Sequence, residues 1–125
     1  MINKIYIIES IPDDEKQTGT ELYNDTIDRY NVFYKSDIKT KLIPINSKSD
    51  LETELNTILN NTLKDDEIII HIEAHGNQNE IGLKNDEGVS WKELTECLIP
   101  INQSCKNKLH LNLVTCFSMY VGLSI

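Results

Sequence analysis

The sequence predicts an α/β domain whose mainly parallel sheet has helices on both faces. Three observations indicate this fold: β-prone segments alternate with segments of helical periodicity, the first strand is continuously apolar, and no repeat or linker divides the chain. A strand that is apolar at every position is typical of a parallel sheet covered on both sides. At 125 residues, the chain is expected to be one domain, residues 1–125.

Two strands and two helices are expected in the first half. In order, they are a strand at residues 5–8, a helix at 20–35, a strand at 38–45 and a helix at 51–63. The first strand is apolar and β-prone throughout, whereas the second is more mixed and ends at Pro44, as a strand nearer the edge does. The first helix repeats apolar residues at roughly helical spacing. Ser49 and Glu52 form a capping box that opens the second helix.

The second half continues the alternation. In order, it supplies a strand at 67–74, a small hairpin over 81–89, a helix at 91–101, a strand at 109–114 and the start of another helix. Ser90 and Glu93 form a second capping box, and Pro100 is expected to loosen the end of the helix that follows. Cys97 lies on the apolar stripe of that helix and is expected in the core. Cys105 lies in a polar stretch and is expected in a loop.

Charge and composition exclude several classes of function. Twenty acidic residues against twelve basic ones give a net charge of −8, which argues against a nucleic-acid partner. The chain has neither a signal peptide nor an apolar run of membrane-spanning length, so no membrane partner is expected. An odd count of three cysteines without a signal peptide indicates a reduced, cytoplasmic protein.

Two reactive side chains are expected at the carboxyl ends of strands, where α/β sheets place their active sites. His75 ends the third long strand, and Cys116 follows the fourth. A neighbouring imidazole activates a thiol by taking its proton, and a helix beginning after Cys116 would also favour the thiolate. Gly76 lets a substrate approach the backbone, and the N–H groups of Gly76 and Cys116 could stabilise an oxyanion.

These residues resemble a known family. The apolar strand that ends in His75 and Gly76, the hairpin, the helix led by Trp91 and the segment Thr115-Cys116-Phe117-Ser118 resemble the caspase-like cysteine peptidases, most closely the CHAT group of caspase-related bacterial peptidases. The resemblance is close over residues 68–119 and covers residues 5–63 only in element order. It implies a three-layer sandwich and cleavage of protein or peptide substrates through a thioacyl intermediate. Cys116 would be the nucleophile, His75 the general acid/base and Gly76 an oxyanion donor, with no cofactor or metal.

The sequence also departs from the caspase-like pattern. The animal-caspase signature Gln-Ala-Cys-x-Gly is absent, and Thr115 stands where metacaspases have an acidic residue that reads the P1 side chain. Thr115 is therefore a candidate substrate-binding residue whose P1 preference is open. Glu73, which shares a strand face with His75, is a second candidate as an orienting or specificity residue. Caspase-like folds carry further strands after the nucleophile, and this sequence ends at Ile125. We therefore expect a large-subunit-like portion lacking the C-terminal strands, with a second chain or C-terminal fragment as a possible partner.

Other interpretations stay open beside the peptidase. The same core could be a non-catalytic interaction module that binds a partner or a peptide strand along an exposed edge. His71 and Glu73 share a strand face with His75 and could seat a metal, although a structural role is favoured. His71 and Glu73 also match half of a zinc-deaminase pattern, but the Pro-Cys-x-x-Cys half of that pattern is missing. The acidic runs at residues 13–15 and 65–67 are expected to be solvated loops.

Overall fold

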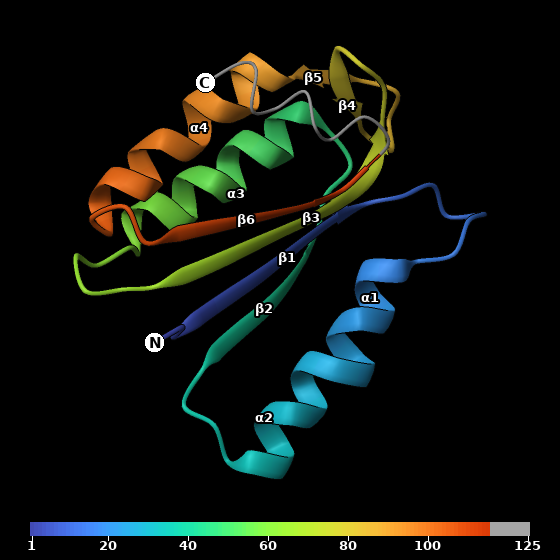
Figure 1. The fold of residues 1–125 in the computed structure, drawn as a ribbon. Helices are drawn as coiled ribbons and strands as arrows, with labels where there is room; N and C mark the ends of the chain where they lie inside the picture. The colour runs from blue at the N-terminus through green and yellow to red at the C-terminus, as the bar shows by residue number, and fades with distance from the viewer. Residues whose placement is uncertain (116–125) are drawn as a thin grey trace.

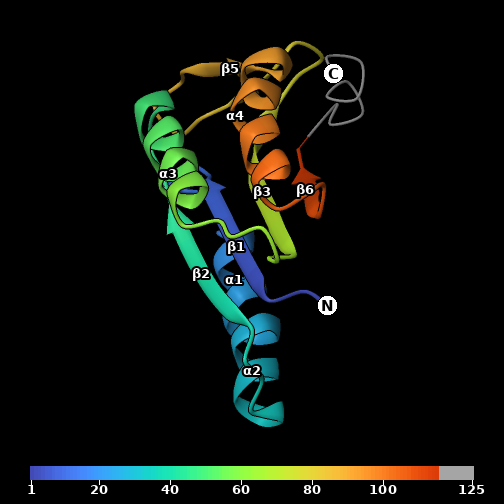
Figure 2. The same cartoon turned by 90° about the vertical axis from the view of Figure 1, so that its left-hand side faces the viewer.

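The fold is that of a computed structural model, which describes residues 1–115. These residues form an α/β structure with a mixed six-stranded sheet and helices on both sides of it (Figure 1, Figure 2). The α/β class predicted from the sequence is confirmed. Within residues 1–115, no helix is long and apolar enough to cross a membrane.

The elements follow one another in nearly the predicted order. They are β1 (Lys4–Ser10), α1 (Thr18–Leu22), the π-helical turn η1 (Tyr23–Asp28), α2 (Arg29–Tyr34), β2 (Lys39–Pro44), α3 (Lys48–Asn60), β3 (Ile68–Gly76), β4 (Glu80–Gly82), β5 (Gly88–Ser90), α4 (Trp91–Ser104) and β6 (Leu109–Val114). The first helical segment runs without a break from α1 through η1 into α2, as Figure 1 shows. The predicted helix at residues 20–35 therefore exists, with a wider turn in its middle.

The long strands are parallel, and the short ones are not. β2, β1, β3 and β6 lie side by side in that order, each pair parallel. β4 is antiparallel to the last two residues of β3, and β5 is antiparallel to β4. The sheet is thus mixed, because the predicted hairpin joins the parallel strands instead of standing apart from them. Both hairpin strands are three residues long.

One face of the sheet carries the apolar core. Alternate residues of the central strands point toward α3 and α4, and successive side chains of a strand point to opposite faces. The fully buried members of this core from β1, β3, α3 and α4 include Ile8, Ile68, Ile70, Leu51, Leu94 and Ile101. Burial of this apolar surface, at roughly 25 cal/mol per Å², is the main force that holds α3 and α4 on the sheet.

The opposite face is polar near α1 and leaves α2 largely uncovered. Glu9, His71 and Glu73 are buried there, beneath α1. Large apolar side chains of this helical segment are exposed at its end, where Phe33 is 78 % exposed and Tyr34 64 %. These side chains of α2 are exposed because α2 extends past the sheet that α1 covers (Figure 2).

Two expectations about the helices are corrected by the structure, and one is confirmed. The side chain of Ser47, not Ser49, caps α3 by accepting a hydrogen bond from the backbone of Asp50. Helix α4 continues through Pro100 to Ser104, so Cys105 is fully buried at its end instead of lying in a polar loop. The predicted capping box of Ser90 and Glu93 is confirmed.

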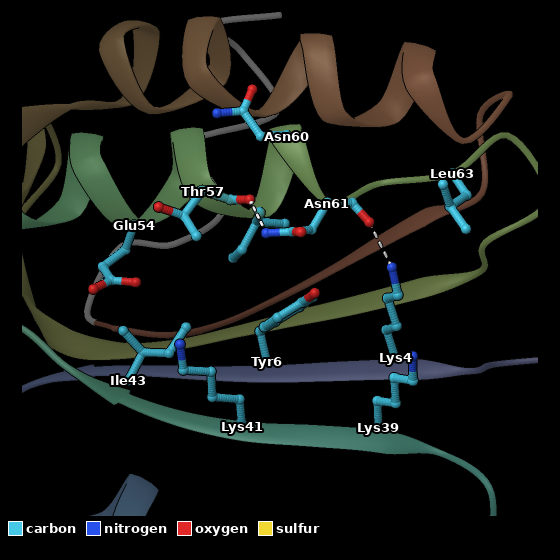
Figure 3. A pocket seen from close by; sticks show the side chains of 11 residues that line it. Lys4, Tyr6, Lys39, Lys41, Ile43, Glu54, Thr57, Asn60, Asn61 and Leu63 are labelled. Atoms are coloured by element: carbon cyan, nitrogen blue, oxygen red, sulfur yellow. Dashed lines mark hydrogen bonds between the residues drawn. The ribbon is translucent and has the colours of Figure 1, made fainter.

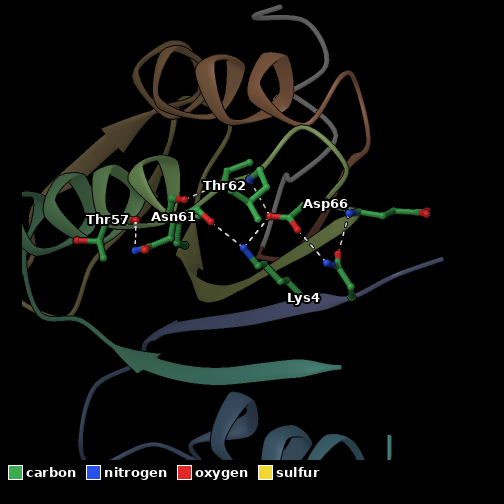
Figure 4. A network of polar contacts seen from close by, with 9 residues as sticks. Lys4, Thr57, Asn61, Thr62 and Asp66 are labelled. Carbon is green, nitrogen blue, oxygen red and sulfur yellow. Dashed lines mark hydrogen bonds and ion pairs between the residues drawn. The ribbon is translucent and has the colours of Figure 1, made fainter. Parts of the chain in front are cut away.

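The acidic run at residues 65–67, expected to be a solvated loop, has a buried carboxylate at its middle residue, Asp66. Asp66 is only 3 % exposed, because it pairs with Lys4 from the start of β1 (Figure 4). Its carboxylate also accepts hydrogen bonds from the side-chain amide of Asn3 and the backbone N–H of Leu63, both at 2.8 Å. A buried carboxylate needs such partners. Asp66 is therefore a structural residue that ties β1 to the end of the α3–β3 connection.

Candidate active site

The carboxyl ends of β3 and β6 lie level with each other. The two strands are parallel neighbours, and their last paired residues are Glu73 and Val114. His75 comes two positions after Glu73 on the same face of β3, and Thr115 follows Val114. A hollow of ≈ 430 Å³ opens between these strand ends, lined by Ala74, His75, Leu113, Val114 and Thr115.

His75 is accessible and already has an acidic partner. Its side chain is 57 % exposed, and its Nε2 lies 2.8 Å from Oε1 of Glu15, which comes from the loop between β1 and α1. This contact orients the imidazole, as a carboxylate commonly does for a histidine. The backbone of His75 and Gly76 pairs with Gly82 and Ile81 of β4, which fixes the end of β3 at the point where the chain turns away.

Glu73 lies on the same face as His75 but is buried. It is 5 % exposed, and each of its carboxylate oxygens has a partner within the protein. Oε1 lies 2.9 Å from Nε2 of His71, and Oε2 accepts a hydrogen bond from the hydroxyl of Thr18 at the start of α1. Glu73, proposed from the sequence as a substrate-binding residue, thus fastens α1 to the sheet directly below His75.

Glu9 supports α1 from the neighbouring strand. It is level with Glu73 in the β1–β3 pairing, and its two oxygens accept hydrogen bonds from the backbone N–H and the hydroxyl of Thr20. The first turn of a helix has backbone N–H groups without helical partners, and Glu9 satisfies one of them. A Cβ at Gly19 would lie 2.7 Å from the Glu9 carboxylate, so the absence of a side chain permits this close approach. Together Glu9 and Glu73 hold the segment that follows Glu15.

The other candidate residues have different outcomes. Cys116, the predicted nucleophile and second oxyanion donor, lies outside the described residues. Thr115 lines the hollow beside His75. Among residues 1–115, no three His, Cys, Asp or Glu side chains gather closely enough to hold a metal ion. Cys97 packs against the core, and burial, followed by the charges of Glu52 and Glu96, raises the pKa of its thiol.

Sequence reasoning missed Glu15 and Thr18. The sequence predicts that Glu15 lies in a solvated loop and that the first helix starts at residue 20, after Thr18, so it points to neither residue as part of the site. One signal could have found them: in a parallel sheet, the loop after the first strand emerges at the carboxyl edge, beside the end of any strand paired with the first. Since β1 pairs with β3, the loop reaches His75.

Comparisons with known proteins add no family to this geometry. No protein-family model matches the sequence, and a search of the curated proteins finds no match. The arrangement at the ends of β3 and β6 is therefore interpreted from its own residues.

Proposed function

We propose that this chain is a caspase-like, CHAT-type cysteine endopeptidase domain with a Cys116–His75 dyad. In this proposal the α/β fold is the three-layer sandwich of such peptidases, its substrates are proteins or peptides, and it acts in the bacterial cytoplasm in regulated proteolysis or defence. The chemistry needs a thiol, an imidazole and two backbone N–H groups. No cofactor takes part.

One observation carries the proposal, namely the register of β3 against β6. Glu73 pairs with Val114, and counting two residues onward along each strand reaches His75 on one and Cys116 on the other. Neighbouring strands are about 4.8 Å apart, and residues two apart in a strand share a face. A β6 register that continues past Val114 would place the thiol beside the exposed imidazole and the hollow between the strand ends.

The proposed reaction follows from these groups. His75 takes the proton of Cys116, and the thiolate attacks the carbonyl carbon of the scissile peptide bond. The N–H groups of Gly76 and Cys116 stabilise the oxyanion, and the imidazolium gives its proton to the leaving amine. Water then attacks the thioester with His75 as base, releasing the acid and restoring the thiol. Glu15 keeps the imidazole oriented through both steps.

The rate of iodoacetamide alkylation at each cysteine, read by peptide mass at about pH 6.5, tests the dyad because the thiolate is the reacting form. The variants are His75→Ala and, as a matched control, His110→Ala. His110 is also an exposed histidine paired with a glutamate: its side chain is 55 % exposed and its Nε2 lies 2.9 Å from Glu67.

We expect Cys116 to react faster than Cys97 and Cys105, and to slow in His75→Ala but not in His110→Ala. Cys116→Ala should in addition abolish cleavage of a denatured protein substrate without changing the unfolding curve. If Cys116 reacts no faster than the other cysteines, or slows equally in both histidine variants, the peptidase proposal is wrong.

A second candidate is a non-catalytic interaction module that pairs with a second chain along β6. It is favoured by one observation: within residues 1–115, β6 has a strand partner on one edge only, and its leucines at 109, 111 and 113 are half-buried. An unpaired strand edge accepts another strand. Hydrogen exchange of the β6 amides should then slow as the protein concentration rises, whereas exchange that is independent of concentration would contradict the module.

A further inference from the structure

A polar groove lies far from His75, between the edge of the sheet and α3. It has a volume of ≈ 490 Å³, and its floor is formed by β1 and β2 and its wall by the second half of α3 (Figure 3). Sites for small molecules commonly have volumes of about 300–1,000 Å³. The groove is thus large enough for a small organic ligand.

The floor of the groove follows from the strand register. Lys4 pairs with Lys39, and Tyr6 pairs with Lys41, in the parallel ladder between β1 and β2. Residues two apart on a strand share a face, so these four side chains all point toward α3. Ile43 continues the same row and closes the floor with an apolar side chain (Figure 3).

Lys4 is occupied by the protein itself. Its ammonium lies 2.6 Å from Oδ2 of Asp66 and donates to the carbonyl oxygen of Asn61 at 2.7 Å (Figure 4). Lys39 and Lys41 differ, because both are exposed and neither forms an ion pair or side-chain hydrogen bond within residues 1–115. Two free positive charges therefore line a groove in a protein whose net charge is −8.

Two further polar groups of the groove, a phenol hydroxyl and a side-chain amide, can each donate a hydrogen bond to a ligand. The hydroxyl of Tyr6 has no hydrogen-bond partner in the described part of the chain, nor has the side-chain amide of Asn60. Burial, partly offset by the charge of Lys4, raises the pKa of Tyr6, so this hydroxyl keeps its proton at neutral pH. A cluster of donors and cations favours a ligand rich in acceptor oxygens.

Glu54 gives the groove a polarity along its length. Its carboxylate lies at the Ile43 end, toward which the side chain of Lys41 also extends, whereas Lys39 lies at the opposite end near Leu63 (Figure 3). No ion pair or hydrogen bond engages this carboxylate among residues 1–115. A ligand that fits both ends has an anionic group at one end and hydroxyl donors at the other.

We propose that this groove binds a phosphorylated sugar, the chemistry shared by sugar phosphates and nucleotides. The phosphate lies against the ammonium group of Lys39, and the hydroxyl of Tyr6 donates to it. Lys41, whose side chain extends toward Ile43 and Glu54, donates to a sugar oxygen (Figure 3). A sugar hydroxyl donates to Glu54, in the way that acidic residues hold ribose in nucleotide sites. Lys4 and Asp66 hold the wall of the groove in place without touching the ligand's charge.

The experiment is a titration of the ¹⁵N-labelled full chain, followed by amide chemical shifts, with ribose 5-phosphate, ribose or inorganic phosphate. The variants Lys39→Gln and Lys41→Gln remove one charge each and keep a polar side chain. Lys92→Gln is the matched control, because Lys92 is an exposed lysine of α4 without an ion pair inside the described chain. Glu54→Gln tests the sugar end.

We expect ribose 5-phosphate to bind with a Kd of about 1 mM or tighter and to shift amides of β1, β2 and α3. Lys39→Gln and Lys41→Gln should each weaken binding roughly tenfold, and Lys92→Gln should leave it unchanged. Ribose 5-phosphate should bind more tightly than inorganic phosphate in the unaltered chain, and Glu54→Gln should remove that difference.

Three results would overturn the proposal. The first is no shift with any probe, which would make Lys39 and Lys41 solvated residues that only protect an edge strand from pairing. The second is equal weakening by Lys92→Gln, which would mean general attraction to positive charge. The third is equal affinity for inorganic phosphate and ribose 5-phosphate, which would show that the groove does not recognise the sugar.

Discussion

The buried pair of Lys4 and Asp66 predicts how the stability of the fold depends on pH. Both the distance between the two charged groups and the direction in which the pKa of Asp66 shifts are known. The two charged groups are 2.6 Å apart, with side chains that are 10 % and 4 % exposed. Burial alone raises the pKa of a carboxyl group, but the hydrogen bonds from Lys4, Leu63 and Asn3 outweigh it. The pKa of Asp66 is thereby lowered from its ordinary value of 3.8 to about 2.

The sign and size of the effect follow from linkage. A carboxyl group with a lowered folded-state pKa stabilises the fold above its unfolded pKa, and that stability is lost as the pH falls through the folded pKa. For Asp66 the contribution is about 2 kcal/mol, present above pH 4 and mostly lost by about pH 2. Asp66→Asn removes the charge at every pH and leaves Lys4 buried without a counter-ion, which costs about 3 kcal/mol at neutral pH.

The assay is urea unfolding followed by circular dichroism, for the unaltered chain and Asp66→Asn, at several values from about pH 7 to about pH 2.5. We expect the difference in unfolding free energy between the two proteins to narrow by most of about 2 kcal/mol over that range. Asp65→Asn is the control, because Asp65 is an exposed neighbour without a partner in the described residues. If the difference in unfolding free energy between the unaltered chain and Asp66→Asn stays constant over this pH range, the reasoning is refuted.

Three further predictions concern the helices, the core and the thiols. Ser47→Ala should lower the unfolding free energy by about 1 kcal/mol and Ser49→Ala by less than about 0.5 kcal/mol in urea, since only Ser47 caps α3; equal losses would contradict the cap. Ile70→Ala, at a fully buried position, should cost about 3 kcal/mol by thermal unfolding, whereas Phe33→Ala, at a position 78 % exposed, should cost less than about 0.5 kcal/mol; the reverse order would contradict the burial of the two faces. Burial and the nearby carboxylates of Glu52 and Glu96 raise the pKa of Cys97, so its alkylation at neutral pH should be slow and should quicken in Glu52→Gln; an unchanged rate would exclude the electrostatic part of this effect.

The strands were predictable because their signal is local. The bounds of β6 are those expected, and β3 differs only by one residue at its start and two at its end. Periodicity identified α3 and α4 as well, but it could not choose between Ser47 and Ser49, since the cap depends on which backbone N–H the hydroxyl reaches. The exposure of Phe33 and Tyr34 was unpredictable for another reason: a sequence pattern shows which residues share a helix face, not whether a sheet extends far enough to cover it.

The candidate site was predictable to the extent that it depends on strand ends. His75 stands where the alternation of strands and helices predicted, at the carboxyl end of a central strand. Its partner Glu15 and the anchor Thr18 come from a different loop, and their roles depend on β1 and β3 being neighbours. The order of the elements in the sequence does not show that β1 and β3 are adjacent strands of the sheet. The grouping of Lys39 and Lys41 with Tyr6 could likewise not be predicted from the sequence, because it arises from the register of β1 against β2.

The two faces of the sheet divide stability and function between them. The face under α3 and α4 is apolar and tightly buried, so it supplies most of the stability of the fold. The face under α1 depends on Glu9 and Glu73. Glu73 accepts a hydrogen bond from the hydroxyl of Thr18, and Glu9 accepts one from the backbone N–H and one from the hydroxyl of Thr20. Because a hydrogen bond to a charged group contributes only about 1.5–3 kcal/mol net, α1 and the loop with Glu15 should open locally at lower free energy than the core unfolds. His75 therefore stands on a strand anchored in the core, beside a loop whose local opening the proposed peptidase would use to admit a peptide to this edge of the sheet.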